Sequence, residues 1–270
     1  MRILFLGTGP TVRLKPNCDS PICKAVKAKK YDSKDYRRNF SMLLSSGEIK
    51  VLLDASPDIE DQVERFNVES VDYILISHGH KDHCGGLIFA VKHLNPKKVL
   101  MHERTFQTIK KRRKLTRNFR RNIEAIPLIQ FLKPDRKIGL NGLGCLPFLF
   151  EHAILEKENY PTFAFIFFEG KKRIVIIPDY ILDYRAFLEK MNYIRGCELL
   201  VTNASVWKTP QFGGASTAIR NVVLAKRWGV KRVILTHVGH TVPSYEIANR
   251  EIKKVWSKAE IAFDGMEVKI

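Results

Sequence analysis

The sequence lacks the features that mark membrane, secreted and low-complexity proteins. No apolar run approaches the roughly 20 residues that a helix needs to cross a bilayer. The first seven residues read as a strand and lack the layout of a secretion signal. Five cysteines are scattered over 270 residues, and such a sparse, odd set argues against a disulfide scaffold. No linker or short repeat interrupts the chain. We therefore expect no membrane partner, a cytoplasmic location and a single domain over residues 1–270.

Acidic residues are few relative to basic ones. The chain has 28 Asp and Glu against 46 Lys and Arg, which gives a formal net charge of +18. Such a charge attracts phosphorylated small molecules or polyanions such as nucleic acid, without identifying either. A surface rich in Lys and Arg is equally typical of thermophile proteins. We expect a phosphorylated small-molecule substrate, with nucleic acid and a homodimer kept as open alternatives for partners.

Four side chains of metal-ligand type fall within the six residues from His78 to His83. They follow the apolar run 71–76, which reads as a buried strand, so the cluster lies on the loop after a strand. In extended backbone His78 and His80 point to the same side and can bind one ion together. Asp82 and His83 come one loop turn later and more naturally face a second ion. A polar loop with scattered histidines is the simpler reading, but this spacing of imidazole and carboxylate groups favours a metal site.

Ligand-type residues also follow other apolar runs in both halves of the chain. The five runs concerned lead into Asp54, His78, His152, Asp179 and His237. Active sites gather where strands end, because strands fix the geometry and loops stay adaptable. One histidine after a strand usually makes only a local hydrogen bond. Five such placements indicate convergence on one site.

The remaining pattern predicts a coarse set of elements. Ser46 and Gly47 read as the turn of a hairpin, and residues 87–94, 216–228 and 245–256 read as helices. The closing stretch 261–268 contains Asp264-Gly265 and is predicted to form a last hairpin.

The stretch 104–122 is strongly basic. It contains nine Lys and Arg residues, among them Lys110, Lys111, Arg112 and Arg113, and its apolar residues have approximately helical spacing. One reading is an ordinary helix with a solvated basic face. The other is a surface beside the active site that contacts phosphates of a small molecule or a nucleic acid.

The pattern His-x-His-x-Asp-His resembles the signature of the metallo-β-lactamase superfamily. The resemblance runs from Leu6-Gly7-Thr8-Gly9 through Asp54 and Thr236-His237 to Asp264-Gly265. It implies an α/β fold, a four-layer αββα sandwich of two mixed sheets with helices outside and the metal site along one edge. It also implies two divalent metals, zinc or manganese, with nickel or iron as alternatives. By this resemblance one ion would be held by His78, His80 and His152, the other by Asp82, His83 and His237, with Asp179 bridging and Asp54 supporting a ligand histidine from behind.

Within the superfamily the chain is most similar to the phosphoribosyl 1,2-cyclic phosphate phosphodiesterases, which open a cyclic phosphate with metal-bound hydroxide. The similarity lies in residues 53–58, in the short spacing from His152 to Asp179 and in an additional structural zinc site near the N-terminus. Cys18, Cys23 and His240 match that zinc site, but Ser20 stands where those enzymes have a middle cysteine. Asp19 or a water would then complete a tetrahedral zinc site. Two unlinked buried cysteines are the alternative.

Ala215 is a second departure from the family pattern. Similar enzymes carry a histidine there that protonates the leaving oxygen or grips the phosphate, so we assign the catalytic positions to Asp82 and residue 215. The predicted function is a binuclear metal-dependent phosphodiesterase. Either the enzyme works without this histidine or it is impaired, and Ala215 is either the natural residue or an engineered substitution. One alternative is a ribonuclease resembling the tRNA 3′-end processing endonucleases, although no insertion resembles their tRNA-gripping arm. Another is a metal- or RNA-binding pseudoenzyme.

Overall fold

The computed structural model describes residues 1–12, 14–111, 117–155, 158–180, 188–209 and 217–270. Three of the residues singled out above, Arg112, Arg113 and Ala215, lie outside the described residues. His152 belongs to a described strand, but its side chain is outside the description.

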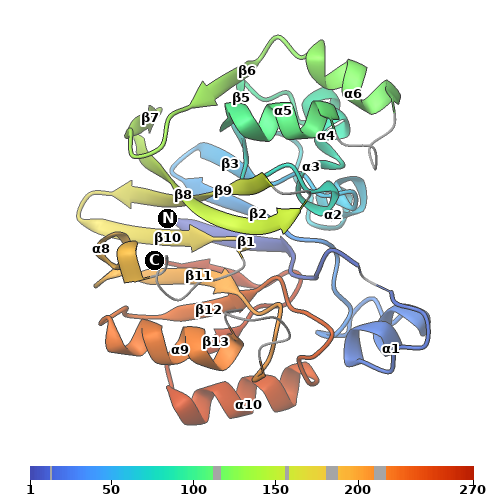
Figure 1. Ribbon diagram of the computed structural model, residues 1–270, viewed down its shortest axis with the longest axis vertical. Coiled ribbons are helices and arrows are strands. Elements are labelled where there is room, and N and C mark those ends of the chain that lie inside the picture. Colours follow the sequence, from blue (N-terminus) through green and yellow to red (C-terminus); the bar gives the residue numbers. More distant parts are fainter. Residues whose placement is uncertain (13, 112–116, 156–157, 181–187, 210–216) are drawn as a thin grey trace.

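Two mixed sheets lie face to face at the centre of the molecule (Figure 1). The first contains, in spatial order, β14 (Glu267–Lys269), β1 (Arg2–Gly7), β2 (Ser41–Ser46), β3 (Ile49–Leu53), β4 (Tyr73–Ile76), β5 (Lys98–His102) and β6 (Ile129–Leu132). The second contains β13 (Ala259–Ile261), β12 (Val233–Thr236), β11 (Leu199–Asn203), β10 (Lys172–Ile177), β9 (Glu158–Glu169), β8 (Leu143–Leu155) and β7 (Ile138–Leu140). Strands β3 to β6 run parallel to one another, and so do β10 to β13. The other neighbouring pairs are antiparallel.

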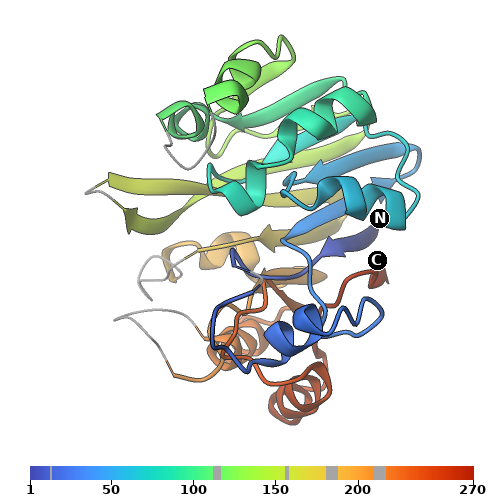
Figure 2. The same ribbon diagram turned by 90° about the vertical axis from the view of Figure 1, so that its right-hand side faces the viewer.

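Helices cover the outer face of each sheet. The first sheet is covered by α2 (Ile59–Arg65), α3 (Lys81–Cys84), α4 (Leu87–Leu94), α5 (Glu103–Lys111) and α6 (Arg117–Glu124). The second is covered by α8 (Met191–Ile194), α9 (Ala218–Arg227) and α10 (Tyr245–Val255). Helix α1 (Pro21–Lys27) lies at the side of the sandwich, on the half that carries α9 and α10 (Figure 2).

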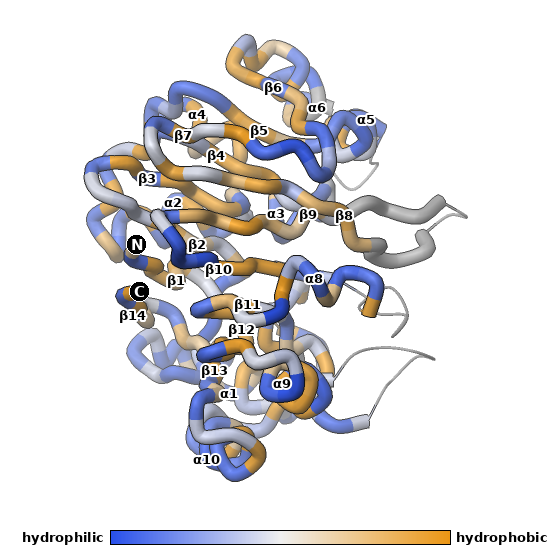
Figure 3. Tube along the Cα trace, turned by 90° about the vertical axis from the view of Figure 1, so that its left-hand side faces the viewer, coloured by the Kyte–Doolittle hydropathy of each residue, from blue (hydrophilic) through white to orange (hydrophobic). Residues whose placement is uncertain are grey.

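The strands are buried on both faces, which explains their continuous apolar sequences. On β10, Ile174 and Ile176 face the core between the sheets, whereas Val175 and Ile177 face the core under α9 and α10. On β3, Leu52 faces the core under α2 and α4. Hydrophobic residues accordingly line the strands, and hydrophilic ones dominate the outer loops and helix surfaces (Figure 3). The predicted four-layer αββα sandwich is confirmed.

Two local predictions were wrong. The closing stretch is no hairpin, because β13 pairs with β12 in the second sheet and β14 pairs with β1 in the first. Strand β8 does not end before His152 but continues to Leu155, with a shift of register between Glu151 and Ile154. Such irregularities are common beside active sites, because they redirect the bulged strand.

Within the described residues, none of the helices combines the length and apolar character of a membrane span.

Candidate metal centre

The loops after β3, β4, β10 and β12 meet at one edge of the sandwich. His78, His80, Asp82 and His83 follow β4, and Asp179 and His237 follow β10 and β12. Their ligand atoms form two clusters of buried side chains: His78, His80 and Asp179 in one, and Asp82, His83 and His237 in the other. Within each cluster the ligand atoms lie within 4.8 Å of one another. The structure thus brings together six of the seven predicted ligands, and the seventh, His152, has no described side chain.

The second cluster has the dimensions of a metal site. His83 Nε2 lies 3.3 Å from His237 Nε2 and 3.3 Å from Asp82 Oδ2, and His237 Nε2 lies 3.4 Å from Asp82 Oδ2. Nitrogen and oxygen ligands at about 2.0–2.1 Å from a tetrahedral zinc ion lie roughly 3.3–3.4 Å from one another. The triangle of these three atoms therefore fits one face of a zinc coordination tetrahedron.

Asp179 lies between the clusters. It groups with His78 and His80, and its Oδ2 is also 3.7 Å from His237 Nε2. The side chain is buried. A carboxylate in this place can face two ions at once, as the resemblance implies.

A serine and an aspartate behind the site orient two histidines. His83 Nδ1 donates to Asp54 Oδ2 over 2.7 Å, which leaves His83 Nε2 for a metal. Ser77 donates from its backbone nitrogen to Asp54 Oδ1 and from its hydroxyl to Asp54 Oδ2, both over 2.7 Å. Because the Ser77 hydroxyl proton is used in this way, its oxygen accepts from His78 Nδ1 at 3.0 Å. His78 therefore also presents Nε2 to the site.

Two residues of the site have left-handed backbone conformations. Asp54 has φ +61° and His237 has φ +51°. Such conformations are uncommon for residues other than glycine and persist where the surroundings enforce them, often at functional sites. Ser205 Oγ lies 3.1 Å from His237 Nδ1 and fixes that ring as well. Close by, a Cβ on Gly239 would come within 1.9 Å of the Ser205 carbonyl oxygen, so only glycine fits there.

The electrostatics of the second cluster favour a shared positive charge. Burial alone would raise the pKa of Asp82, but His83 and His237 together hold it well below its usual value. Burial would lower the pKa of His83, yet Asp82 and Asp54 raise it well above the usual range. The carboxylates thus stabilise a cation among these rings.

The two carboxylate oxygens of Asp82 have different surroundings. Thr11 Oγ1 donates to Asp82 Oδ2 over 2.9 Å. Asp82 Oδ1 is buried, and among the described residues it has no hydrogen-bond partner. A buried carboxylate oxygen without a donor costs free energy unless something else binds it. The donor set and this oxygen fit a divalent metal.

A third cluster joins α1 to the loop after β12. Cys23 Sγ lies 3.5 Å, Cys18 Sγ 3.7 Å and Ser20 Oγ 3.1 Å from His240 Nδ1. Cys18 Sγ also donates to Ser20 Oγ over 3.2 Å. The structure therefore brings together the predicted Cys18, Cys23 and His240, with the Ser20 hydroxyl beside them.

The basic stretch is only partly described. Lys110 forms an ion pair with Glu124 at 3.0 Å and lies over the Phe106 ring, so it links α5 to α6. Lys111 is exposed.

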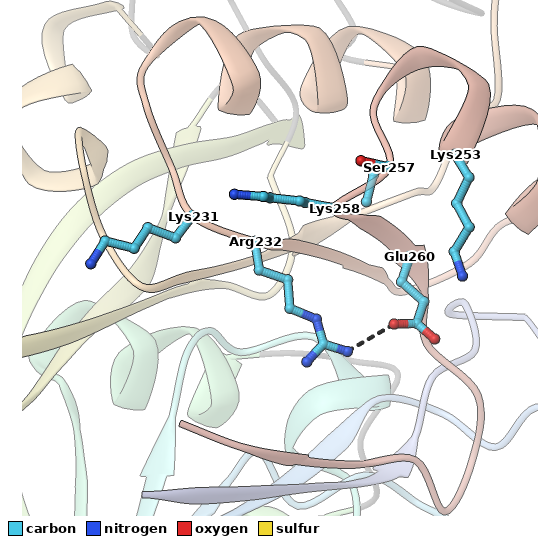
Figure 4. A pocket seen from close by; sticks show the side chains of 7 residues that line it. Lys231, Arg232, Lys253, Ser257, Lys258 and Glu260 are labelled. Atoms are coloured by element: carbon cyan, nitrogen blue, oxygen red, sulfur yellow. Dashed lines mark hydrogen bonds and ion pairs between the residues drawn. The ribbon is translucent and has the colours of Figure 1, made fainter.

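A separate basic hollow of about 320 Å³ lies at the starting ends of β12 and β13, away from the metal clusters at the far end of β12. Figure 4 shows Arg232 paired with Glu260 there, while the ammonium groups of Lys231, Lys253 and Lys258 do not converge. This hollow contributes no residue to the metal centre.

Sequence reasoning missed the polar residues that orient the ligands. Thr11, Ser77, Ser205 and Asn203 all contact a predicted ligand. Ser77 adjoins His78, so its place after a strand was a usable signal. The other three are far from their partners in sequence, and no local pattern marks them.

Known proteins resemble the chain over its whole length. The zinc-bound PqqB from Methylobacterium extorquens is 17% identical, with a TM-score of 0.77 and full coverage of both chains. A diphosphatase of the PhnP family is 21% identical, with a TM-score of 0.74 over 100% of this chain and 97% of that one. Human short-form tRNase Z is 16% identical, with a TM-score of 0.63 over 100% and 99%. At these identities the likeness shows the fold.

Curated sequences match the chain as well. An octanoyltransferase from Porphyromonas gingivalis is 23% identical over 99% of this chain, and the chain spans about half (51%) of that protein. An uncharacterized protein from Methanocaldococcus jannaschii is 35% identical over 75 residues, which are 26% of this chain and 29% of that protein.

The sequence model of one family, the beta-lactamase superfamily domain, matches residues 50–238, well over half of the chain. This range contains all seven predicted ligands and the whole of strand β12, which precedes His237. The chain therefore belongs to the β-lactamase superfamily and has the fold of its metal-dependent hydrolases.

Proposed function

We propose that the protein is a binuclear metal-dependent phosphodiesterase that opens a small cyclic phosphate ester. The observation that carries this proposal is the pair of ligand clusters with Asp179 between them. His78, His80 and His152 would hold one ion, Asp82, His83 and His237 the other, and Asp179 both. When bound, two such ions polarise a phosphoryl oxygen and lower the pKa of water toward neutrality.

The chain's own residues would keep this centre fixed. Asp54 holds the His83 ring, Ser77 holds the His78 ring, and Thr11 holds one oxygen of Asp82. The side chains of Asp54, Ser77, His78 and His83 are fully buried, which excludes water from behind the ligands. A preorganised site of this kind needs no rearrangement as charge develops in the reaction.

A phosphate substrate agrees with the remaining observations. The chain carries a net charge of +18, which attracts anions. A diphosphatase and a tRNase are among the proteins that share its fold. Zinc or manganese suits the mixed nitrogen and oxygen ligands.

The third cluster supports a structural zinc site. We propose that Cys18, Cys23 and His240 bind zinc with the Ser20 hydroxyl in the fourth place. A zinc ion at about 2.3 Å from sulfur and about 2.0–2.1 Å from nitrogen sets sulfur–nitrogen separations near 3.5 Å. The separations of 3.5 and 3.7 Å between the two thiols and His240 Nδ1 are close to that value. A neutral hydroxyl in place of a thiolate should make this site weaker than a three-thiolate one.

A ribonuclease is the second candidate. The likeness to human tRNase Z over the full chain and the basic helices α5 and α6 favour it. Against it, Lys110 is engaged by Glu124 in an ion pair.

One turnover experiment separates the candidates. The protein, loaded with manganese or zinc, is given phosphoribosyl 1,2-cyclic phosphate, a nucleoside 2′,3′-cyclic phosphate and a precursor tRNA. We expect hydrolysis of a cyclic phosphate and no cleavage of the tRNA. Cleavage of the tRNA alone would establish the ribonuclease, and no turnover with bound metal would establish the pseudoenzyme.

A further inference from the structure

A chain of buried hydrogen bonds lies behind Asp179. Asn203, the last residue of β11, donates from Nδ2 to Asp179 Oδ1 over 3.2 Å and to the Tyr180 backbone oxygen over 2.9 Å. Asn221, on α9, donates from Nδ2 to the Asn203 backbone oxygen over 2.9 Å and lies 3.4 Å from Asn203 Oδ1. Exposure is 5% for Asp179, 3% for Asn203 and 1% for Asn221, so water does not compete for these bonds.

The partners determine how both amides are oriented. Asn203 Nδ2 faces two oxygen acceptors, a carboxylate and a carbonyl, so this side must be the NH₂ group. Asn221 must likewise turn its NH₂ group to the Asn203 backbone oxygen, which leaves Asn221 Oδ1 to accept from the Tyr180 hydroxyl at 3.1 Å. Tyr180 then accepts from Thr202 Oγ1 at 3.0 Å. Every donor in this series of hydrogen bonds meets an acceptor. Turning either amide over would place its oxygen against another oxygen.

We propose that Asn203 is a positioning residue for the metal centre: its amide holds Asp179 Oδ1 and so fixes the carboxylate that lies between the two clusters. This inference rests on the proposed two-metal centre. Asn221 fixes the Asn203 amide and thereby ties α9 to the centre.

An amide suits this place better than an acid. It can hold a carboxylate oxygen as a neutral donor, whereas an ionised aspartate at the same position would repel Asp179 and offer no proton. With Oδ1 held, Asp179 keeps one rotamer, and Oδ2 stays 3.7 Å from His237 Nε2. Residues that orient metal ligands in this way typically contribute about 10–100-fold to metal affinity.

The test measures metal affinity separately from folding. Full-length protein is stripped with a chelator, and binding of Zn²⁺ is measured by competition with a chromophoric chelator. The melting temperature of the metal-free protein is recorded for each variant. Asn203→Leu keeps the branched shape without the donor, and Asn203→Ser is a second, smaller variant in case the first does not fold. Thr202→Val is the matched control, because Thr202 is buried in the same hydrogen-bond chain but bonds to Tyr180 and not to Asp179.

We expect Asn203→Leu and Asn203→Ser to bind Zn²⁺ about 10–100-fold more weakly at the two-metal centre. Thr202→Val should stay within about twofold of the wild type even if its metal-free melting temperature falls. Wild-type affinity in both Asn203 variants would overturn the inference. The inference would also be overturned if Thr202→Val lost as much Zn²⁺ affinity as the Asn203 variants and the loss in each variant paralleled the fall in its melting temperature. If the wild type itself bound fewer than two ions at this centre, the proposed function would fail first, and the inference with it.

Discussion

Asp179 is the residue on which the two clusters depend. Its carboxylate groups with His78 and His80 and also faces His237, and its other oxygen is held by Asn203. No other described carboxylate is placed with both clusters, since Asp82 belongs to the second one only.

The variant Asp179→Ala should therefore lose the bridge between the ions. We expect it to retain at most one ion per chain at this centre and to lose most of its activity. Elemental analysis of the purified variant, beside the wild type, measures the loss. Retention of two ions at the centre would contradict the bridging role.

By the family resemblance we expect a proton donor at residue 215, where this chain has alanine. Loss of one positioned acid commonly costs about 10²–10⁴ in rate. Ala215→His should raise turnover without changing metal content or stability. The gain should be large for esters with poor leaving groups, where protonation matters most, and small for nitrophenyl esters. An equal gain on both kinds of ester would show that residue 215 is not the missing acid.

The five cysteines should differ in reactivity. Hydrogen bonds that the Ser20 hydroxyl and backbone N–H give to the thiolate lower the pKa of Cys18, whereas burial raises the pKa of Cys197 to about 12 and that of Cys145 further. Thiolates are the reactive form, so at pH 7–8 a lower pKa means faster alkylation. In metal-free protein we expect iodoacetamide to modify Cys18 well before Cys145 and Cys197, as read by peptide mass spectrometry. Zinc should slow the reaction of Cys18, and unchanged rates would argue against the third site.

Among the elements, the strands were the most predictable from sequence, and the closing stretch 261–268 was the least predictable. Asp54, His78, Asp179 and His237 follow strands as expected, because parallel strands bring their carboxyl ends to one edge. The turn signal Asp264-Gly265 was read as a hairpin, but a local signal does not reveal which sheet each flanking strand joins. Asp264 in fact accepts hydrogen bonds from Thr8 and from the Arg38 backbone, and so ties the tail to the N-terminal loop.

Contacts between residues far apart in the sequence also could not be predicted from local patterns. His240 meets Cys18 across 222 residues, and this pairing came only from the family resemblance. The contact between Asn203 and Asp179 had no signal at all, because a lone asparagine after a strand is unremarkable in sequence.

The basic helices α5 and α6 give a prediction about substrate size. If they contact nucleic acid, reversing the charges of Lys110, Lys111, Arg112 and Arg113 should weaken RNA binding and flatten its salt dependence. Hydrolysis of a small cyclic phosphate should stay nearly unchanged, because Lys110 is held by Glu124. Binding titrations at several salt concentrations and a turnover assay on the same variant test both statements. A strong loss of small-substrate turnover would contradict both interpretations of this stretch.

At the scale of the whole molecule, the apolar pattern decided the fold. Strands buried on both faces need a layer on each side, and the sequence supplies enough apolar residues for three cores, one between the sheets and one under each helical layer. The site then follows from the fold, since loops from both sheets reach the same edge. The extent of a single domain stays a prediction.

The central claim is that two divalent ions at this edge are needed for phosphodiester hydrolysis. It is tested most directly by titrating chelator-treated protein with Mn²⁺ while following hydrolysis of bis(p-nitrophenyl) phosphate. Manganese is chosen because the thiols of the third cluster favour zinc over manganese. The account predicts no hydrolysis without metal and a rise that is complete at two equivalents per chain. Hydrolysis that survives chelation, or that is complete at one equivalent, would contradict it.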